Sequence, residues 1–344
     1  MTLRHEWGAL PTEDHPLVQL GRALQQAGYR FTTISTPSHR RVNAREGNAL
    51  ARDLRGVFGW SRPFADGAFD AHIMDLMARV GILQSDPEGW RSALRASTLG
   101  GDLYFHSAFP TDATDAVFFG PDTYRYAQVL EAALAETPLA PVHRAVDIGC
   151  GAGPGAVTMA RRLPQAQVWA TDINPQALTL TALNAHLAGV ANIIPAYVNL
   201  LDRVAQQAPK HGAARSMDYE IWDETRGFDL IAANPPFMVD ADERTYCHGG
   251  GALGEGLSLA IVEASLSQLA PGGRLVLYTC VAIVDGQDPF LARAADLVAA
   301  AGYTLRYREL DPDVFGGELG SELHTAANTD RIAAVYLVVT RPLP

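Results

Sequence analysis

The sequence predicts an α/β protein in which strands and helices alternate, and three features of its second half support this. Apolar residues 145–148 run into a glycine-rich turn at 149–155, after which a helical pattern begins. A second apolar run, 168–171, ends at Asp172, and a later one ends at Asn234. Strands alternating with helices favour a parallel sheet covered on both faces. The carboxyl ends of its strands, where ligands bind in such sheets, then meet at one edge.

Length and composition indicate a two-domain globular protein. The chain has 344 residues, and domains usually contain roughly 100–200 residues. The composition changes little along the chain, so we divide it by pattern into residues 1–110, mainly helical, and residues 111–344, which hold the ligand-binding motifs. The amino-terminal residues lack an apolar signal core and no apolar run approaches the roughly 18 residues of a membrane span, so we expect a cytoplasmic protein. The cysteines form no CxxC pair and are expected to be reduced thiols, not a disulfide framework or a zinc site: Cys150, Cys247 and Cys280.

Residues 1–110 show helical spacing in three places. Leu17, Leu20 and Leu24 recur at that spacing before a stop at Gly28. The apolar residues of 49–58 and of 69–80 follow similar patterns, and residues 90–99 could add another turn or helix. Residues 102–109 alternate weakly, as in a strand. These apolar stripes are expected to form a core.

Charge is distributed unevenly over the two parts. The net charge is −11, but the first 100 residues contain 12 Arg against 10 acidic residues. The remainder contains 15 basic and 28 acidic residues. A basic cluster in the first part could bind RNA or an acidic partner through its charges, or it could be a solvated helix face: His39, Arg40, Arg41, Arg45, Arg52 and Arg55.

A helix is predicted between the two parts. Phe118 to Pro121 resembles a strand end followed by a turn, and Asp122 or Thr123 is expected to be the N-cap. Since this helix leads into the strand at 145–148, its amino end should lie over the ligand pocket. We therefore expect Thr123 and Tyr124 at that pocket, with plain helix capping as the alternative.

The glycine turn and the acid after the second strand together indicate an adenosine-containing ligand. Gly149, Gly151 and Gly153 allow a ligand to approach the backbone, and a carboxylate at Asp172 can accept hydrogen bonds from both ribose hydroxyls. The same glycine spacing also fits a dinucleotide, so an NAD-dependent oxidoreductase is the rival hypothesis. Asp147 counts against it, because a carboxylate suits an ammonium group and would repel a pyrophosphate.

The tetrapeptide Asn234, Pro235, Pro236, Phe237 follows the apolar run 228–233. The two prolines cannot donate ladder hydrogen bonds, so the strand must end there, unless this is a simple turn. The Asn234 oxygen and the carbonyl of Pro235 could accept both hydrogens of a planar amine or amide nitrogen, and thereby stabilise charge that develops during attack. Phe237 offers a flat wall for stacking.

These motifs, DIGCGAGPG with Asp172 and NPPF after FDLIAA, resemble the class I S-adenosylmethionine-dependent methyltransferases of the Asn-Pro-Pro-Tyr/Phe group. That group includes the release-factor glutamine methyltransferases and RNA and DNA base-amine methyltransferases. The resemblance covers residues 115–342. It implies a Rossmann-like, seven-stranded, mostly parallel sheet with an antiparallel last strand, and residues 111–344 as the catalytic domain with 1–110 recognising the substrate. The cofactor residues it implies or favours are Thr123, Tyr124, Asp147, Gly149, Gly151, Gly153, Asp172, Ile173, Asn199, Leu200 and Asn234.

The chain departs from the group at several points. Many relatives hold the adenine amine with an acid after the third strand, where this chain has Asn199, with Asp202 as the next candidate. Residues 203–226 form a long polar insertion. Residues 246–257 resemble the glycine-rich substrate loop and could be a mobile lid or a connector. The loop containing Phe315 suggests no function from its sequence.

The expected reaction is an in-line transfer to a nitrogen aligned by Asn234 and Pro235, without a metal or a covalent enzyme intermediate. No HExxH motif, Cys/His cluster or Ser-His-Asp arrangement indicates other chemistry. The acidic catalytic part favours a protein amide such as glutamine as acceptor. An exocyclic amine of rRNA or tRNA, guided by the arginine cluster, is the alternative, as is a small nitrogenous metabolite. The oligomeric state is left open.

Overall fold

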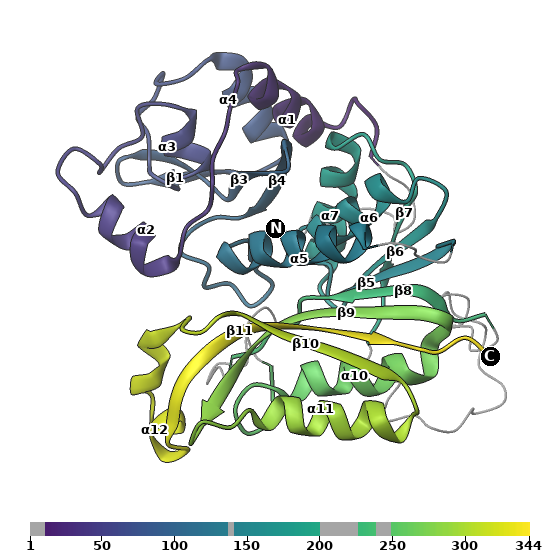
Figure 1. Cartoon of the computed structure of the whole chain (residues 1–344). Coiled ribbons are helices and arrows are strands. Elements are labelled where there is room, and N and C mark those ends of the chain that lie inside the picture. Colours follow the sequence, from purple (N-terminus) through teal and green to yellow (C-terminus); the bar gives the residue numbers. More distant parts are fainter. Residues whose placement is uncertain (1–10, 137–140, 200–225, 239–248) are drawn as a thin grey trace, which may run out of the picture.

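A seven-stranded mixed sheet forms the centre of the molecule in the computed structural model, which describes residues 11–136, 141–199, 226–238 and 249–344 (Figure 1). The strand order is β10-β11-β9-β8-β5-β6-β7, in which β11 runs antiparallel to both neighbours and the other pairs are parallel. The predicted sheet with its closing hairpin is therefore confirmed. The strands are β5 (Arg144–Ile148), β6 (Gln167–Asp172), β7 (Ile193–Tyr197), β8 (Phe228–Ala233), β9 (Leu269–Val284), β10 (Thr304–Asp311) and β11 (Thr329–Thr340).

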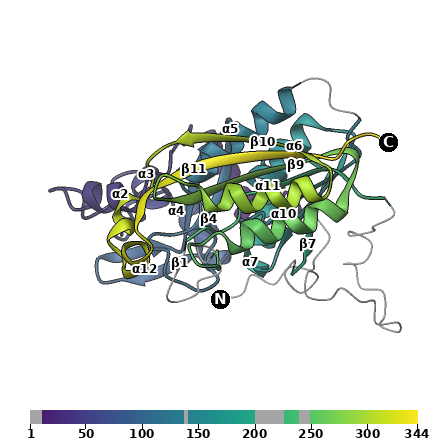
Figure 2. The same cartoon turned by 60° about the horizontal axis from the view of Figure 1, so that its bottom comes forward.

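Helices cover both faces of this sheet. One face packs against α5 (Pro121–Ala135), α6 (Pro154–Arg162) and α7 (Pro175–Leu187), and the other against α10 (Gly256–Gln268) and α11 (Pro289–Ala300). Figure 2 shows α10 and α11 side by side along their face. Adjacent strand residues divide between two apolar cores: Leu230 belongs to one and Ile231 to the other. Such runs, apolar on both faces, are typical of parallel strands buried between helices.

The amino-terminal part is not purely helical. It contains α1 (Pro16–Gln26), α2 (Thr36–Asn43), α3 (Leu54–Phe58) and α4 (Ala71–Arg79), followed by two hairpins. The hairpins are β1 (Leu83–Asp86) with β2 (Gly89–Ser92), and β3 (Leu94–Leu99) with β4 (Asp102–Ser107). The predicted helices at 17–24 and 69–80 are confirmed, the one at 49–58 is reduced to α3, and the strand at 102–109 is present as β4. The turn or helix predicted for residues 90–99 is wrong.

Gly100 and Gly101 explain that correction. They separate Leu99 from Asp102, and their φ angles are 61° and 95°. Two residues with positive φ form the tight turn that joins antiparallel strands, so the pair fixes β3 and β4 as a hairpin. This local turn chemistry decides the structure of residues 94–107, whereas their apolar spacing alone fits a helix as well.

The amino-terminal part and the sheet share one continuous core. Asn184 on α7 accepts a hydrogen bond from the Phe105 backbone N–H at 2.8 Å and donates to the Phe105 and Ala152 carbonyls at 3.0 and 2.8 Å. Gly21 of α1 lies so close to Leu187 that a Cβ there would come within 2.6 Å of its side chain. The amino-terminal part is thus fixed to α7, the helix that follows β6. A domain boundary at residue 110 stays a prediction.

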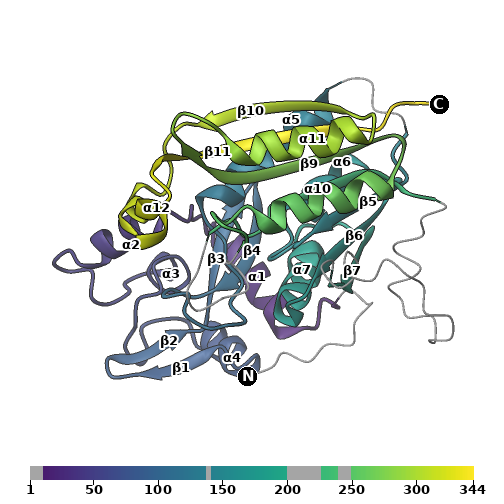
Figure 3. The same ribbon diagram turned by 90° about the horizontal axis from the view of Figure 1, so that it is seen from below.

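The β10–β11 hairpin ends in a folded segment that we call the tip, residues 312–328. It contains a short 3₁₀ helix, η1 (Gly316–Gly320), and α12 (Glu322–Ala326). Figures 1 and 3 show α12 and α2 at the same end of the molecule. The chain runs toward that end along the parallel strands β5 to β9, so the tip lies near their carboxyl ends.

Candidate functional site

The carboxyl ends of three neighbouring strands, β8, β5 and β6, bring the predicted residues to one level of the sheet. Ile148 of β5 is in register with Ala233 of β8 and with Thr171 of β6. The residues that follow, Gly149, Asn234 and Asp172, therefore lie side by side. With about 4.8 Å between strands, Asn234 and Asp172 are separated by about 10 Å, which suits a ligand of nucleoside size.

The glycine turn needs its glycines for two different reasons. Gly149, Gly151 and Gly153 have φ angles of 69°, 55° and 86°, which side chains rarely adopt. A Cβ on Gly149 or Gly151 would meet no atom within 4 Å, so the space beside these residues is open. At Gly155 a Cβ would lie 2.6 Å from Asp147 Oδ2. The first two glycines thus border a space open to a ligand, and Gly155 allows close packing behind the turn.

Asp172 stands between this turn and an apolar surface. Its Oδ2 accepts from the Gly151 N–H at 3.0 Å and its Oδ1 from the Asn174 N–H at 2.9 Å. Burial raises the pKa of this carboxyl above its ordinary value. Beside it Ile173 is 42% exposed, and Tyr197 on β7 is 51% exposed. Each carboxylate oxygen has a further lone pair, so a sugar can bind here while a flat base covers the apolar side chains.

Asp147 is enclosed, with only 1% of its surface exposed. Its Oδ1 accepts a hydrogen bond from the Tyr126 hydroxyl, and its Oδ2 accepts from the Ala156 N–H, both at 2.7 Å. Both oxygens therefore join α5 and α6 to the strand under the turn. Burial raises the pKa of this carboxyl to about 7. Direct contact with a cofactor stays a prediction, and the observed contacts make Asp147 a residue that positions the turn.

The raised pKa of Asp147 predicts how stability depends on pH. The folded protein keeps a proton up to about pH 7 that the unfolded chain releases near its ordinary pKa of 3.8. The retained proton therefore adds at most about 4 kcal/mol to the free energy of unfolding. This contribution is fully present below about pH 4 and is lost as the pH rises to about 7. Asp147→Asn can still accept from Ala156 and donate to the Tyr126 oxygen. Relative to the wild type, the free energy of unfolding of the variant should increase as the pH rises from about 4.5 to about 7.5, and denaturant unfolding measures this. The same pH dependence in both proteins would contradict the prediction.

The start of α5 differs from the prediction. Pro121 is the first helical residue and Gly120 is the N-cap, so an N-cap at Asp122 or Thr123 is wrong. The Thr123 hydroxyl accepts from the Gly120 N–H at 3.1 Å, one turn inside the helix. The Tyr124 hydroxyl accepts from the Thr33 N–H at 3.0 Å, in the amino-terminal part. These contacts match the capping alternative for Thr123, and cofactor contact by either residue stays a prediction.

The Asn-Pro-Pro-Phe segment presents an unused hydrogen-bond acceptor. Asn234 is half-buried, and its Oδ1 is buried without a hydrogen-bond partner in the described parts of the chain. An unpaired buried acceptor is costly, so such groups often mark a functional position. The Phe237 ring lies 5.5 Å from that of Phe315 in the tip, at 55°. The side chains that follow the strand therefore combine a hydrogen-bond acceptor with an apolar wall.

A glycine loop packs directly on the backbone of this segment. The Gly249 N–H donates to the Met238 carbonyl at 2.7 Å. A Cβ on Gly249 would lie 2.7 Å from the Pro236 carbonyl oxygen, and one on Gly254 would lie 2.1 Å from the Phe237 carbonyl oxygen. Only glycine fits at such distances, so the described part of the predicted lid, from residue 249 onward, is held against the tetrapeptide.

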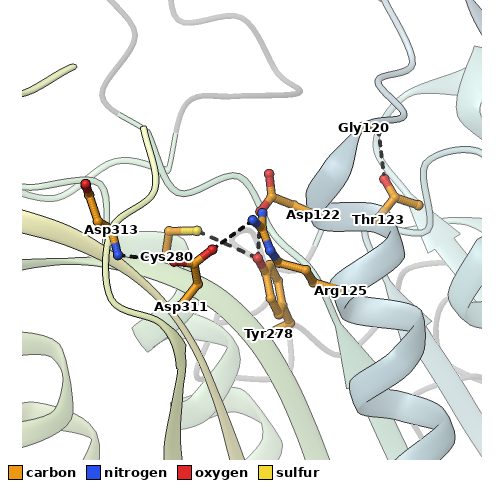
Figure 4. A network of polar contacts seen from close by, with 8 residues as sticks. All are labelled: Gly120, Asp122, Thr123, Arg125, Tyr278, Cys280, Asp311 and Asp313. Carbon is orange, nitrogen blue, oxygen red and sulfur yellow. Dashed lines mark hydrogen bonds and ion pairs between the residues drawn. The ribbon is translucent and has the colours of Figure 1, made fainter. Parts of the chain in front are cut away.

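A polar network that the sequence did not reveal ties α5, β9 and the end of β10 together (Figure 4). Asp122 is buried, and its Oδ1 accepts from the Tyr278 hydroxyl at 2.6 Å and from Arg125 at 3.2 Å. Arg125 also donates to Asp311 at 3.0 Å. Since Ala233 pairs with Leu277, Tyr278 lies at the level of Asn234 on the neighbouring strand. No local pattern links residues so far apart in sequence, which is why sequence analysis missed them.

Some predicted residues have little or no described environment. Asn199 is half-buried two residues after β7, where the prediction put it, and its contact with a cofactor stays a prediction. Leu200, Asp202, nearly all of the 203–226 insertion and residues 246–248 lie outside the described residues, as does Cys247.

Within the described ranges no group of three His, Cys, Asp or Glu is placed to hold a metal ion. No helix described there is long and apolar enough to cross a membrane.

Comparison with known protein families agrees with the position of the glycine turn and Asp172. Residues 125–211 match the model of the methyltransferase small domain. Over these residues the chain is similar to that domain. The matched residues include the glycine turn and Asp172 but end before Asn234, and the match favours a methyltransferase over the dinucleotide interpretation of the turn. The predicted resemblance to S-adenosylmethionine-dependent methyltransferases of this group is thereby confirmed.

Two similar curated proteins are bacterial. A release factor glutamine methyltransferase of Deinococcus radiodurans is 29% identical over 202 residues, covering 55% of this chain and 61% of the relative. One from Cereibacter sphaeroides is 34% identical over 161 residues, covering 43% and 49%. The chain thus spans about half to three fifths of the length of these relatives.

Two solved structures that match are less similar in sequence. M. jannaschii TYW2 in complex with AdoMet is 12% identical with a TM-score of 0.43, covering 72% of this chain and 85% of that one. The ribosomal protein L11 methylase of Lactobacillus delbrueckii is 17% identical with a TM-score of 0.39, covering 64% and 79%.

Proposed function

We propose that this protein is an S-adenosylmethionine-dependent methyltransferase that methylates the side-chain amide nitrogen of a glutamine in a protein. The observation that carries this proposal is the unpaired Oδ1 of Asn234, which lies at the level of Gly149 on the neighbouring strand. An acceptor at this position, beside a turn that leaves room for a nucleoside, suits an amide that must donate hydrogen bonds while it is methylated.

The residues present fit S-adenosylmethionine. The open space beside Gly149 and Gly151 admits the ligand close to the backbone. Asp172 would hold the ribose, and Ile173 and Tyr197 would cover the adenine. Asn199 would meet the adenine amine, and Leu200 was predicted beside it. Thr123, Tyr124 and Asp147 would act mainly by fixing the first helix and the turn, given the partners their side chains already have.

The chain's own residues would act on the acceptor nitrogen. Bound S-adenosylmethionine supplies an electrophilic methyl group. The Asn234 Oδ1 and the Pro235 carbonyl would each accept one N–H of the amide, which orients the nitrogen lone pair toward the methyl carbon and stabilises positive charge developing on nitrogen. Pro236 keeps the segment extended, and Phe237 covers the flat face of the amide. The amide nitrogen would gain the methyl group as the carbon–sulfur bond of the donor breaks, and one amide proton would leave to water.

Two observations favour a protein acceptor over RNA. The relatives of Deinococcus radiodurans, Cereibacter sphaeroides and Moorella thermoacetica are named release factor glutamine methyltransferases. Moreover, residues 309–330, which border the Phe237 side of the site, contain six acidic residues and no Lys or Arg, and only two of the six, Glu309 and Asp311, form ion pairs with arginines within the described residues. A phosphate backbone would be repelled there. The arginines of and after α2 favour the RNA alternative, because all are exposed: Arg40, Arg41, Arg45, Arg52 and Arg55.

Transfer from S-adenosylmethionine carrying a labelled methyl group tests this proposal. The protein is incubated with a bacterial extract, and the products are divided and treated with nuclease or protease. We expect the label to survive nuclease, to be released by protease and to be found as N-methylglutamine after digestion. Label released by nuclease would instead establish RNA as the acceptor. In that case neutralising Arg40 and Arg41 together should weaken RNA binding and flatten its salt dependence.

A further inference from the structure

A cavity of about 240 Å³ opens beside Phe237 on the side away from the glycine turn. Cys280 and Ala282 of β9 and Ile332 of β11 form its floor, and Phe315 and Leu323 of the tip form its outer wall. The pocket therefore joins the Asn-Pro-Pro-Phe segment to a part of the chain that the proposed chemistry does not use. A group that binds against Phe237 would therefore lie next to this pocket.

The floor and outer wall of this pocket are apolar. Burial raises the pKa of the Cys280 thiol well above its ordinary value, so the thiol is neutral and contributes an apolar surface. A cavity of about 150 Å³ with apolar walls accommodates a benzene ring, so this one has room for one large aliphatic or aromatic side chain. It is smaller than the roughly 300–1,000 Å³ of ordinary small-molecule sites. These properties fit a single side chain of a larger acceptor.

Polar groups gather at one side of the pocket, on the tip. Ser321 and His324 are half-buried there, and His324 Nδ1 lies 3.1 Å from the Thr329 hydroxyl. Glu318 lines the pocket but is itself exposed, so it stands at the rim. With the acidic excess of residues 309–330 around it, the rim favours a basic residue near the side chain that enters.

The tip is held in place before any partner binds. The Val314 N–H donates to the Ile332 carbonyl at 2.8 Å, and Arg331 donates to Glu309 at 2.9 Å. Arg125 binds Asp311 at the base of the tip and joins it to the network around Asp122. A pocket whose walls are fixed in this way needs little ordering on binding, so it can discriminate between side chains.

We propose that this pocket is a specificity subsite that binds an apolar side chain of the acceptor polypeptide, close in its chain to the methylated glutamine, with a basic residue beside Glu318. This inference rests on the proposed function and adds the neighbouring residues to it. Phe237 is the shared wall, with the amide on one side and the apolar side chain on the other.

Short synthetic peptides centred on glutamine test the subsite. The set varies the residues on either side between leucine and alanine, and between lysine and glutamate. Initial rates of methyl transfer and fluorescence anisotropy of labelled peptides are measured for each. We expect leucine to raise kcat/KM roughly 10-fold or more over alanine at one position, since it buries several methylene groups. Lysine should be preferred to glutamate roughly 3-fold to 10-fold near it.

Two charge variants on the tip locate the effect. Glu318→Lys should reverse the preference between lysine and glutamate peptides, with the change in KM and not in kcat. Glu322→Lys is the matched control, because Glu322 is also exposed on the tip but does not line the pocket. An equal response to both variants would overturn the subsite. Leu323→Trp, which fills the pocket, should abolish the leucine preference while alanine peptides remain substrates.

The outcomes separate the subsite from the proposed function. Glutamine methylation that ignores the neighbouring residues would overturn the subsite and leave the proposed function standing. Peptide binding with the leucine and lysine preferences, but without methyl transfer, would support the subsite and contradict the proposed chemistry. Neither binding nor transfer with any peptide of the set, together with label in RNA, would contradict both.

Discussion

Replacing Asn234 by alanine is expected to lower the rate of methyl transfer roughly 10²-fold to 10³-fold, the usual loss for one preorganised polar contact. The side-chain oxygen is buried and without a partner within the described chain, so removing that oxygen breaks no hydrogen bond there. The folded state should therefore keep its stability. The loss should appear in kcat, because the contact strengthens as charge develops on the acceptor nitrogen.

Cofactor binding separates this effect from general damage. Isothermal titration with S-adenosylmethionine should give Asn234→Ala an affinity within a few-fold of the wild type, since Gly149, Gly151 and Asp172 are unchanged. Asn199→Ala is the opposite case, because Asn199 was predicted to bind the adenine. This substitution should lower the affinity for the cofactor by a larger factor than it lowers kcat. Near-normal turnover by Asn234→Ala with normal cofactor binding would exclude the proposed role of its side chain.

The parts of the site that could be predicted from the sequence are short runs of consecutive residues. Glycines that need positive φ, an acid at a strand end and two prolines after an apolar run each constrain the backbone locally. Parallel strands then bring these segments to one edge, so the level shared by Gly149, Asp172 and Asn234 could be predicted. The number of strands and the antiparallel last strand were implied by the family resemblance, whereas the strand order is known from the structure alone.

Tertiary contacts account for what could not be predicted. Asp147 looks like a ligand residue in sequence, but its oxygens are used by Tyr126 on α5 and by Ala156 on α6. The pocket beside Phe237 joins segments nearly 100 residues apart, and the tip that closes it shows no motif. Long-range packing of this kind leaves no periodic pattern in the chain.

Asn184→Ala is expected to show that the amino-terminal part supports the cofactor turn. The Asn184 side chain is fully buried and satisfies the Phe105 N–H, the Phe105 carbonyl and the Ala152 carbonyl. The alanine variant leaves these backbone groups without the side-chain partner, so the free energy of unfolding should fall by about 3–5 kcal/mol. Because Ala152 belongs to the glycine turn, affinity for S-adenosylmethionine should fall with it. Denaturant unfolding and calorimetric titration measure the two quantities.

Asn192→Ala is the matched control for this coupling. Its side chain also contacts three backbone groups, but these are the carbonyls of Ala160, Leu163 and Ala166, in and just after α6 and away from the amino-terminal part. The control should lose stability without a comparable loss of cofactor affinity. If both variants lose affinity in proportion to stability, the turn responds to global destabilisation alone. If only Asn184→Ala loses it, the contact between β4 and the turn sets the shape of the cofactor site, and residues 1–110 support that site in addition to the acceptor recognition predicted for them.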